Sequence, residues 1–494
     1  MKKRVERLRG MYDVLPDIYL HQHEVIHQLQ AFLTLAGYSP VDTPILERGD
    51  LYLASFGQEL WQNLYTFRLH QRDLCLRPEY TASICRLLLD HYQQAPLPLR
   101  FQYAGPVFRY EAPGRGRYRQ HTQLGIELFG GNGIAPDAEI LQLACEALHT
   151  LGISTYRLEL GHIGVASRFI SSLQLDEQAA RLLLSLMEQI SRSEEGEQLA
   201  RERIESLYPS ENDALARFTN GESANTAFLA QLLSGISVFD AQTANRQEII
   251  ERFLWKLGRN EQRQQMMRAL EFLRELHGIS GSPPGAFEAL RDLLARYKLD
   301  DGPVLELERL LALLEQSNVP SSQILLNLAL GRGVSYYTGL VFEIHALDGY
   351  DTQLCGGGRY DSLMRAVGSS RDMKACGFAF GIERLLPLIP GNLPEPQPAT
   401  ALVIPVHNND FPYALEIGRA LRQQGVRTEV DVNGHGVGAG LKYAAKQSIR
   451  FAFIVGESER QANVVTMRNL TTGKEQRLTL NELGSSILER ENAR

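Results

Sequence analysis

The stretch FRYEAPGRGRYRQHTQLGIELFG, residues 108–130, decides the fold. Alternating polar and apolar residues on both sides of a loop rich in glycine and arginine predict two antiparallel strands joined as a hairpin. On the first strand, period two places Arg109 and Glu111 on one face. The hairpin therefore presents charged side chains where the first strand runs into the loop.

The second strand of this hairpin has one polar and one apolar face. Gln123, Gly125 and Glu127 share the polar face, and the leucine and isoleucine residues between them point the other way, towards the core. A glycine inside a strand is unfavourable unless something approaches its backbone closely. We therefore expect an open floor between Gln123 and Glu127, on which a ligand lies.

The loop between the two strands adds positive charge. It contains Arg115, Arg117 and Arg119, and its two glycines allow it to bend. Because an arginine guanidinium forms bidentate hydrogen bonds with phosphate oxygens, the hairpin fits a small molecule with a cationic part and a phosphate part. The alternative interpretation is an exposed hairpin with a charged tip.

Two further segments place polar residues at turns. In LRPEYTAS, which begins at Leu76, a proline separates Arg77 from Glu79 and excludes a simple helix, and a carboxylate held at such a turn suits an α-amino group. In GRGVSYYTGLVFE, residues 331–343, Arg332 stands between two glycines and ahead of two tyrosines. This arginine suits a phosphate, and a glycine-rich turn into a core strand is the alternative.

Two glycine-containing motifs follow later in the chain. CGGGRYDSL, residues 355–363, places three glycines shortly before Tyr360, which a tight turn explains equally well. CGFAFGIERLL, residues 376–386, predicts a strand that turns into a helix, with Arg384 near the helix N-terminus, where anions bind favourably. A surface ion pair of Glu383 is the alternative. The sequence contains neither a P-loop nor a dinucleotide-binding fingerprint.

The composition is that of an ordinary globular protein, with 494 residues, 44% of them hydrophobic and 22% charged. The net charge of −7 argues against non-specific coating of nucleic acid. Five scattered cysteines without metal-ligand spacing predict reduced thiols in or near the core. The N-terminus lacks the apolar segment of a signal peptide, and no apolar run of about 18 residues is present to span a membrane. We expect a cytoplasmic protein, and we assign no metal site to protein side chains.

The sequence divides into four parts. Residues 1–164 and 320–390 mix helical and strand periodicity and predict one discontinuous α+β core. Residues 165–319 have Leu, Glu, Arg and Gln at helical spacing, which predicts a helical insertion with a solvated charged face. A proline-rich linker, residues 391–399, leads to residues 400–494, where strands and helices alternate as in a small α/β domain with a mainly parallel sheet.

Taken together and in this order, the motifs resemble the class II aminoacyl-tRNA synthetase core in its histidyl-tRNA synthetase form. RGMYDVLP, residues 9–16, resembles the N-terminal motif of that family, the opening stretch resembles its motif 2, and GFAFGIERLL resembles its motif 3. The segments that begin at Gly331 and Gly356 resemble its two histidine-specific segments. The helical insertion matches the family only in its position.

The resemblance implies a six- or seven-stranded antiparallel sheet flanked by helices, a homodimer and a C-terminal anticodon-binding-like domain. It implies ATP-dependent activation of histidine and transfer to tRNA(His), with Mg²⁺ as a cofactor. The implied ATP ligands are Arg109, Glu111, Arg117 and Arg384, and the implied catalytic residues are Arg332 and Arg109. The implied histidine ligands are Glu79, Thr81, Gln123, Glu127, Tyr336, Tyr337 and Tyr360.

The chain departs from the family pattern at several positions. Tyr80 stands where a glycine is common, Ser335 replaces an acidic residue of a histidine-specific segment, and His121 and Thr122 change the end of motif 2. In addition, residues 158–186 resemble the regulatory subunit of ATP phosphoribosyltransferase. That subunit is a paralogue that binds histidine and regulates the catalytic subunit without charging tRNA.

Three functions are therefore compatible with the sequence. The complete set of arginines and the C-terminal domain, which the regulatory paralogue normally lacks, favour the synthetase over a histidine-binding regulatory subunit. The third alternative is a paralogue that adenylates an acid for a non-tRNA acceptor. Lys442 and Lys446 lie one turn apart on an expected helix and, with Arg115, are candidates for contact with tRNA. For the two lysines, a solvated helix face is the alternative.

Overall fold

The computed structural model describes residues 5–56, 64–112, 114, 116–175, 179–180, 182–183, 194–207, 262–317, 319–330, 336–349, 351–391, 399–434 and 436–483. The chain forms two compact units, Met1–Asn392 and Leu393–Arg494. Most of the expected linker, residues 392–398, lies outside the described residues, and the finer domain boundaries stay predictions. Among the described helices, not one has a stretch long and apolar enough to cross a membrane.

The hairpin predicted from the opening stretch is present. Its strands are β5 (Leu99–Phe108) and β6 (Gln120–Phe129), which pair antiparallel with Tyr103 opposite Gly125. The apolar residues of β6 are buried in the main hydrophobic core, as its alternation predicts; they are Leu124, Ile126 and Leu128. The polar face of β6 lies against a second, smaller core.

The hairpin lies within a nine-stranded sheet, in the order β1-β5-β6-β12-β11-β10-β7-β9-β8. Its other strands are β1 (Ser39–Pro40), β12 (Ala375–Gly381), β11 (Gln353–Arg359), β10 (Leu340–Ala346), β7 (Tyr156–His162), β9 (Ile324–Asn327) and β8 (Ser280–Gly281). Neighbouring strands are antiparallel except in the pairs β1–β5 and β7–β9. The predicted antiparallel core is confirmed in six strands, from β5 to β7 in the sheet order, and β9 and the two-residue strands β1 and β8 extend it at its edges.

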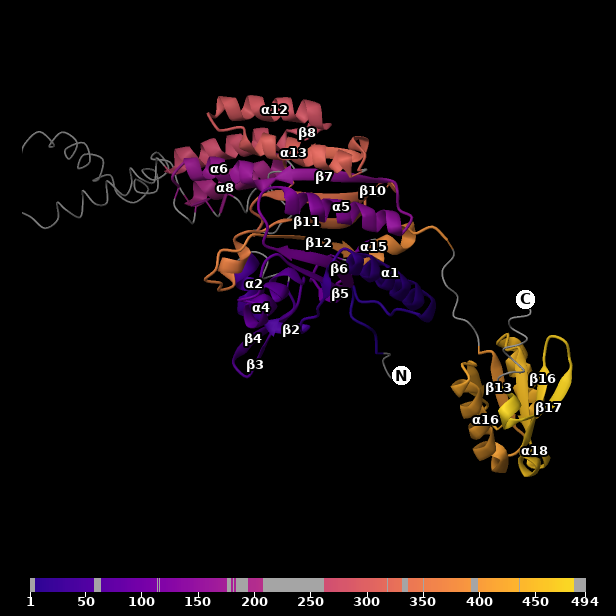
Figure 1. Ribbon diagram of the computed structural model, residues 1–494. Helices are drawn as coiled ribbons and strands as arrows, with labels where there is room; N and C mark the ends of the chain where they lie inside the picture. Colours follow the sequence, from indigo (N-terminus) through magenta and orange to yellow (C-terminus); the bar gives the residue numbers. More distant parts are fainter. Residues whose placement is uncertain are drawn as a thin grey trace, which may run out of the picture. The chain divides into compact units, whose positions relative to one another are not determined.

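Two helices cover the main-core face of this sheet. In Figure 1, α5 (Ala135–Thr150) lies across the middle strands and α1 (Pro16–Leu35) lies beside it. The apolar residues of α1 that reach the core recur every four residues, which places them on one side of the helix; they are Val25, Leu29 and Leu33. The helix ends just before Gly37, whose φ of +86° favours glycine.

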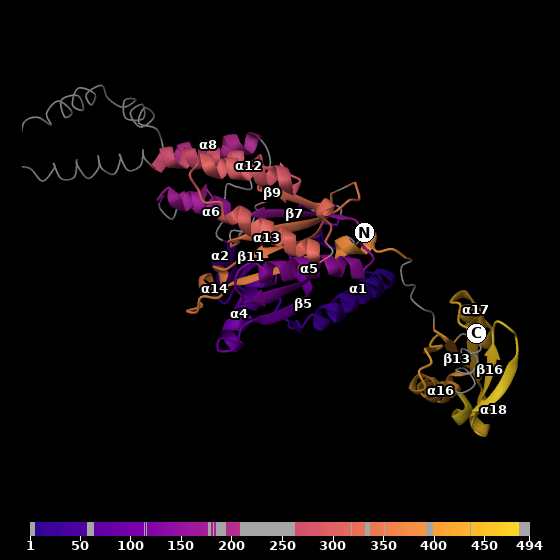
Figure 2. The same ribbon diagram turned by 45° about the horizontal axis from the view of Figure 1, so that its top comes forward.

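The described part of the insertion is mainly helical and packs on the same core. Its helices are α6 (Ile163–Ser172), α8 (Glu194–Leu207), residues 262–277, α12 (Pro283–Arg296) and α13 (Gly302–Gln316). Figures 1 and 2 show them gathered at the end of the sheet that carries β7 and β9. Their buried residues join the main core, so within the described residues the insertion is an extension of the first unit.

The other face of the sheet carries the second core. It is covered by α2 (Gly49–Phe56), α4 (Thr81–His91) and α14 (Leu363–Ala366), next to a small sheet of β2 (Leu46–Arg48), β4 (Arg72–Leu76) and β3 (Thr66–Leu69).

The five cysteines are buried and not in disulfides, which confirms their predicted place in the interior.

The second unit is a mixed sheet, in contrast to the mainly parallel sheet predicted. Its strand order is β14-β13-β15-β16-β17, and only the pairs of β13 with β14 and β15 are parallel. The strands are β13 (Ala401–Pro405), β14 (Thr428–Val430), β15 (Phe451–Val455), β16 (Val464–Asn469) and β17 (Glu475–Thr479), and the helices are α16 (Phe411–Gln423), α17 (Val437–Lys446) and α18 (Glu457–Ala462). The connection from β16 to β17 is too short for a crossover helix, so these strands form an antiparallel hairpin.

Candidate functional site

Glu127 is the most enclosed acid of the candidate site. It lies on the polar face of β6 and is 1% exposed. Three hydroxyl groups donate to its carboxylate, from Thr81 at 2.6 Å, from Tyr103 at 3.3 Å and from Tyr360. Burial, with a smaller contribution from the nearby Glu79 carboxylate, raises the pKa of Glu127 to about 8. The carboxyl group is therefore held in one orientation and titrates near neutral pH.

Glu79 is the second buried acid, at the turn into α4. Its carboxylate accepts hydrogen bonds from the backbone N–H groups of Thr81 and, at 3.0 Å, Ala82. Burial raises the pKa of Glu79, and the backbone hydrogen bonds and the charge of Arg109 oppose this effect. Glu79 and Glu127 together are called the carboxylate pair below. The oxygen atoms of both groups accept hydrogen bonds, which suits the N–H donors at the cationic end of a ligand.

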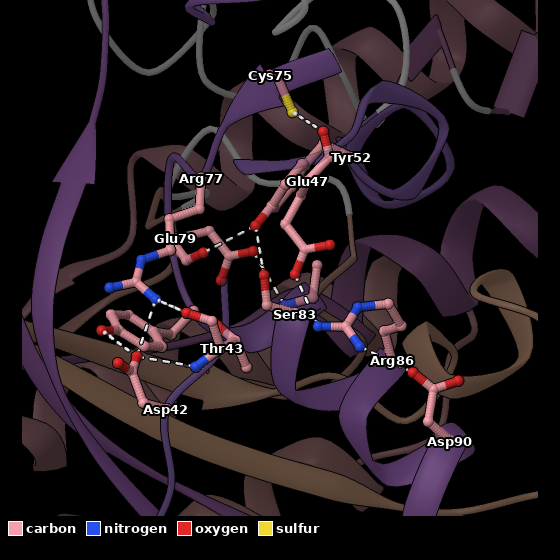
Figure 3. A network of polar contacts seen from close by, with 12 residues as sticks. Asp42, Thr43, Glu47, Tyr52, Cys75, Arg77, Glu79, Ser83, Arg86 and Asp90 are labelled. Atoms are coloured by element: carbon pink, nitrogen blue, oxygen red, sulfur yellow. Dashed lines mark hydrogen bonds and ion pairs between the residues drawn. The ribbon is translucent and has the colours of Figure 1, made fainter. Parts of the chain in front are cut away.

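Polar contacts hold the turn that presents Glu79 from two sides (Figure 3). The Arg77 side chain is 1% exposed, and its Nη1 donates to Asp42 at 3.0 Å and to the carbonyl oxygen of Thr43. On the other side, the Tyr52 hydroxyl donates to the carbonyl oxygen of Glu79 at 3.2 Å. Arg77 therefore anchors the turn instead of facing a ligand.

The polar face of β6 carries Gln123 and Gly125 as predicted, but the expected open floor is filled. Tyr103 lies opposite Gly125, and a side-chain carbon on Gly125 would come within 2.6 Å of the Tyr103 hydroxyl. The close approach that this glycine permits thus comes from the protein itself. Gln123 is 8% exposed and its Oε1 accepts no hydrogen bond from the described residues, so this oxygen is free to bind a ligand.

The three tyrosines predicted for the pocket lie beside the carboxylate pair. Tyr360 follows β11 and meets the ring of Tyr336 edge-on, with 5.8 Å between the ring centroids. Tyr336 is 8% exposed and lies 5.0 Å from the ring of Tyr337, which in turn packs on Gly358. Because Tyr360 also donates to Glu127, the tyrosines form one connected group with this acid.

Arg109, Arg117 and Arg384 are called the arginine cluster below, and Arg109 links this cluster to the carboxylate pair through its charge on Glu79. Arg109 follows β5, and its Nε donates to the carbonyl oxygen of Pro78 at 2.9 Å. Arg384 follows β12, and its Nε donates to the backbone of the hairpin loop at 3.2 Å. Burial and the charges of Arg109 and Arg117 lower the pKa of Arg384. Since these like charges repel one another, an anion such as a phosphate group would stabilise the cluster.

The predicted turn from a strand into a helix is present at Arg384, and this helix is short. α15 (Ile382–Leu385) has four residues, so its dipole is small and the guanidinium group supplies most of the positive charge. Glu383 is not the surface ion pair considered as an alternative. It accepts the backbone N–H of Thr122 on both oxygens, at 2.8 and 3.0 Å, and the Tyr12 hydroxyl at 2.9 Å. Glu383 thus fixes α15 against the hairpin.

His121 lies on the same face of β6 as Gln123 and close to the arginine cluster. Burial, followed by the charges of Arg109 and Arg384, lowers the pKa of His121 to about 3. Its imidazole is therefore neutral at physiological pH and adds no further positive charge. Glu111 stands at the exposed end of the cluster, where its Oε1 lies 4.0 Å from Nη1 of Arg109.

Tyr103 is a site residue that the sequence analysis did not assign. Its hydroxyl reaches Glu127 across Gly125, although the two residues lie on different strands. A signal for it was present in the sequence, because period two places Tyr103 on the same face of the first strand as Arg109. The pairing register, which the loop length leaves open, is what brings Tyr103 opposite Gly125.

The remaining predicted residues either lie outside the described residues or belong to the second unit. Arg115, Arg332 and Ser335 lie outside the described residues. Lys442 and Lys446 belong to the second unit, where both are exposed on α17, the helix predicted for them. Their four-residue spacing places them on one side of that helix.

A mainly antiparallel sheet, a hairpin with an arginine-rich loop and an arginine just after β12 together define a class II aminoacyl-tRNA synthetase core. A family model described as Histidyl-tRNA synthetase matches residues 10–254 and 241–385, and one described as Anticodon binding domain matches residues 400–490. The chain belongs to the histidyl-tRNA synthetase family.

Individual relatives agree with this family assignment. A histidine–tRNA ligase of Pyrococcus horikoshii is 28% identical over 488 residues, which cover 98% of each chain. The crystal structure of a histidyl-tRNA synthetase from a Nostoc species matches with a TM-score of 0.58 at 21% identity, over 99% of this chain and 100% of that one. A Bacillus halodurans protein described as an ATP phosphoribosyltransferase regulatory subunit/histidyl-tRNA synthetase matches with a TM-score of 0.60 at 22% identity, over 92% of this chain and 99% of that one. At these identities the two solved structures establish the fold.

Proposed function

We propose that this chain activates histidine with ATP to form histidyl-adenylate and pyrophosphate, and then transfers the histidyl group to tRNA(His). The observation that carries the proposal is the position of the carboxylate pair beside the arginine cluster. One end of this arrangement suits the cationic groups of histidine, and the other end suits phosphates. Similarity to curated histidine–tRNA ligases over nearly the whole chain supports the choice of substrates.

In the activation step, an oxygen of the histidine carboxylate attacks the α-phosphorus of ATP, and the bond to pyrophosphate breaks. The nucleophile is already ionised, so the step needs positioned positive charge and no general base. We assign Arg109 and Arg332 to the α-phosphate, Arg384 to the γ-phosphate, and Arg117 with Glu111 to the nucleotide. If Arg332 is a preorganised charge donor, the variant Arg332→Ala lowers adenylate formation roughly 10²-fold or more. Unchanged pyrophosphate exchange in this variant would refute the assignment.

We assign the amino acid to the polar face of β6 and the turn before α4. Glu79, Thr81 and Gln123 hold the α-amino group and orient histidine. Glu127 and Tyr337 bind the imidazole nitrogens, and Tyr336 and Tyr360 close the pocket. Since Thr81 and Tyr360 donate to Glu127, part of their effect passes through this carboxylate. Buried groups that pair with an imidazole reject analogues that lack one, which gives selectivity without editing.

Mg²⁺ is implied by the family as a companion of ATP. Within the described residues, no group of three His, Cys, Asp or Glu side chains is arranged to hold a metal ion. Mg²⁺ usually binds through one or two carboxylates together with substrate phosphates, so it would enter with the phosphates of ATP. No step of the reaction is assigned to it.

We also propose that the protein works in the cytoplasm and that Arg115, Lys442 and Lys446 contact tRNA.

We further propose that the protein is a homodimer. Large apolar side chains on β2, α2 and β3 are between 42% and 51% exposed, as expected of a surface that a second copy covers; they are Leu46, Leu53, Phe67 and Leu69. Light scattering on the purified 55.4 kDa chain tests the dimer, with twice this mass as the expected result. A monomer at micromolar concentration contradicts it.

Histidine-dependent ATP–pyrophosphate exchange, followed by charging of tRNA(His), tests the function. The synthetase assignment requires both activities. Histidine binding without exchange would show a regulatory protein, and exchange without charging would show an enzyme that adenylates an acid for another acceptor. Charging by a variant that lacks residues 400–494 would separately refute the role given to the second unit.

A further inference from the structure

Tyr80 is enclosed on three sides by groups that serve the site. It is fully buried, and the guanidinium carbon of Arg77 lies 3.9 Å from the centre of its ring. The ring of Tyr103 stacks on it at 4.3 Å, with 18° between the ring planes. The Tyr80 hydroxyl donates to Asp42 at 3.1 Å. Its orientation is therefore fixed by a cation–π contact, a stacked ring and a hydrogen bond.

The Tyr80 side chain also fills the space above a glycine of the hairpin. A side-chain carbon on Gly105 would collide with the Tyr80 hydroxyl and would come within 2.8 Å of Nη2 of Arg77. Gly105 lies opposite Gln123 in the β5–β6 register. Tyr80 thus occupies the floor beside Gln123, in a space that a smaller side chain would leave empty.

Two of the groups fixed by Tyr80 belong to the proposed histidine pocket. Tyr80 stands between Glu79 and Thr81 in the chain, so its packing holds the turn that presents both. Its ring also supports Tyr103, whose hydroxyl donates to Glu127 at 3.3 Å. A shift of Tyr80 would therefore displace both members of the carboxylate pair.

We propose that Tyr80 is a positioning residue that keeps the turn at Glu79 and the Tyr103–Glu127 contact in the geometry that binds histidine. It touches neither substrate and acts through these neighbours. The inference rests on the proposed function, because it concerns the amino-acid half of the same site. The effect on ATP binding should be smaller, because Arg109 is the member of the arginine cluster that contacts this turn, through the carbonyl oxygen of Pro78.

The test compares Tyr80→Leu, which removes the stacked ring, with Tyr80→Phe, which keeps the ring and loses the hydroxyl. Tyr156→Leu is the matched control, because Tyr156 is equally buried but lies on β7 in the main core. Calorimetry measures the Kd for histidine and for ATP in the full-length protein. We expect the Kd for histidine to rise about tenfold in Tyr80→Leu and less than about threefold in Tyr80→Phe, with the Kd for ATP rising less than about threefold in either variant. Tyr156→Leu should lower Tm and leave both Kd values unchanged.

A second pair of variants tests the same role of Tyr80 if Tyr80→Leu does not fold. Gly105→Ala should weaken histidine binding because the added methyl group meets the Tyr80 hydroxyl, and Gly105→Ala combined with Tyr80→Phe should recover most of the loss. Normal histidine binding in both Tyr80→Leu and Gly105→Ala would overturn the inference, as would equal losses for histidine and ATP in Tyr80→Leu. A wild-type protein that binds no histidine would overturn the proposed function itself, and the inference with it.

Discussion

Nε of Arg109 donates to the carbonyl oxygen of Pro78 at 2.9 Å, one residue before Glu79. This hydrogen bond joins the arginine cluster to the turn that presents the carboxylate pair. The charge of Arg109 also favours the ionised form of Glu79. The two halves of the site are therefore coupled in position and in charge, so a ligand with a cationic and an anionic end can span them.

Arg384 should contribute to the reaction of ATP and not to the binding of histidine. Replacing it by glutamine removes one positive charge from the arginine cluster, and we expect exchange to fall roughly 10²-fold or more, with the Kd for histidine unchanged. Exchange kinetics and calorimetry measure the two effects. Arg365→Gln is the control, because Arg365 pairs with Asp372 on the exposed surface. Equal losses in both variants would argue against a role for Arg384 in the site.

Glu127 should make the stability of the ligand-free protein depend on pH. Its pKa is about 8 in the folded chain, against an ordinary value of 4.5. Between these values the folded state keeps a proton that the unfolded state has lost, so the free energy of unfolding falls as pH rises, by up to about 1.4 kcal/mol per pH unit. The stabilisation is fully present below pH 4.5 and is lost as pH rises through 8.

The variant Glu127→Gln removes this titration and keeps the shape of the side chain. We expect Tm of the wild type to fall more steeply than that of Glu127→Gln between pH 6 and pH 8.5 in thermal unfolding. If the plots of Tm against pH for the two proteins are parallel, Glu127 is ionised throughout this range. That result would contradict a pKa raised by burial.

Arg359 and Asp137 form a buried ion pair that should contribute to stability. Nη2 of Arg359 lies 2.9 Å from Oδ2 of Asp137, and both residues are less than 10% exposed. The variant Asp137→Ala leaves the guanidinium with the Asp361 carboxylate at 3.1 Å and the carbonyl oxygen of Gly133 at 3.2 Å, and should lower the free energy of unfolding by about 3 kcal/mol. Denaturant unfolding measures the loss. In comparison, Asp13→Ala breaks the exposed pair with Arg7 and should cost less than about 1 kcal/mol.

Lys442 and Lys446 should contribute to the binding of tRNA and not to the formation of the adenylate. Replacing both by glutamine should raise the KM for tRNA(His) in charging and leave pyrophosphate exchange unchanged. If each lysine contacts a phosphate, the slope of log KM against log salt concentration should change by about 0.7 to 0.9 per lysine. Lys474→Gln, which removes another exposed lysine of the same unit, is the control. A salt slope equal to that of the wild type would show that both lysines belong to a solvated face.

The hairpin and its two faces could be predicted because their signal is local. Strict alternation in β6 separates Gln123 and Glu127 from the leucines of the core, and the structure keeps this separation. The helical periodicity within residues 1–164 is likewise local, and α1 and α5 bury apolar residues at this spacing. Short strands such as β8 and β9 carry no such period, so the edge of the sheet next to the insertion was not predicted.

The enclosed geometry of the site could not be predicted, because it depends on long-range pairing. Gly125 was interpreted as an opening for a ligand, but the register of β5 and β6 places Tyr103 there. The sequence also gave no sign that Glu383 binds the backbone of Thr122 instead of a surface cation. In both cases the partner lies on another strand or far along the chain, where composition and spacing carry no information.

A crystal structure of the protein grown with ATP and histidine tests the central claim most directly. We expect density for one continuous ligand, histidyl-adenylate, with the imidazole beside Glu127, the amino group beside Glu79 and the phosphate beside Arg109. Density for the nucleotide away from the arginine cluster, or for histidine away from the carboxylate pair, would contradict the claim that the two clusters form a single site.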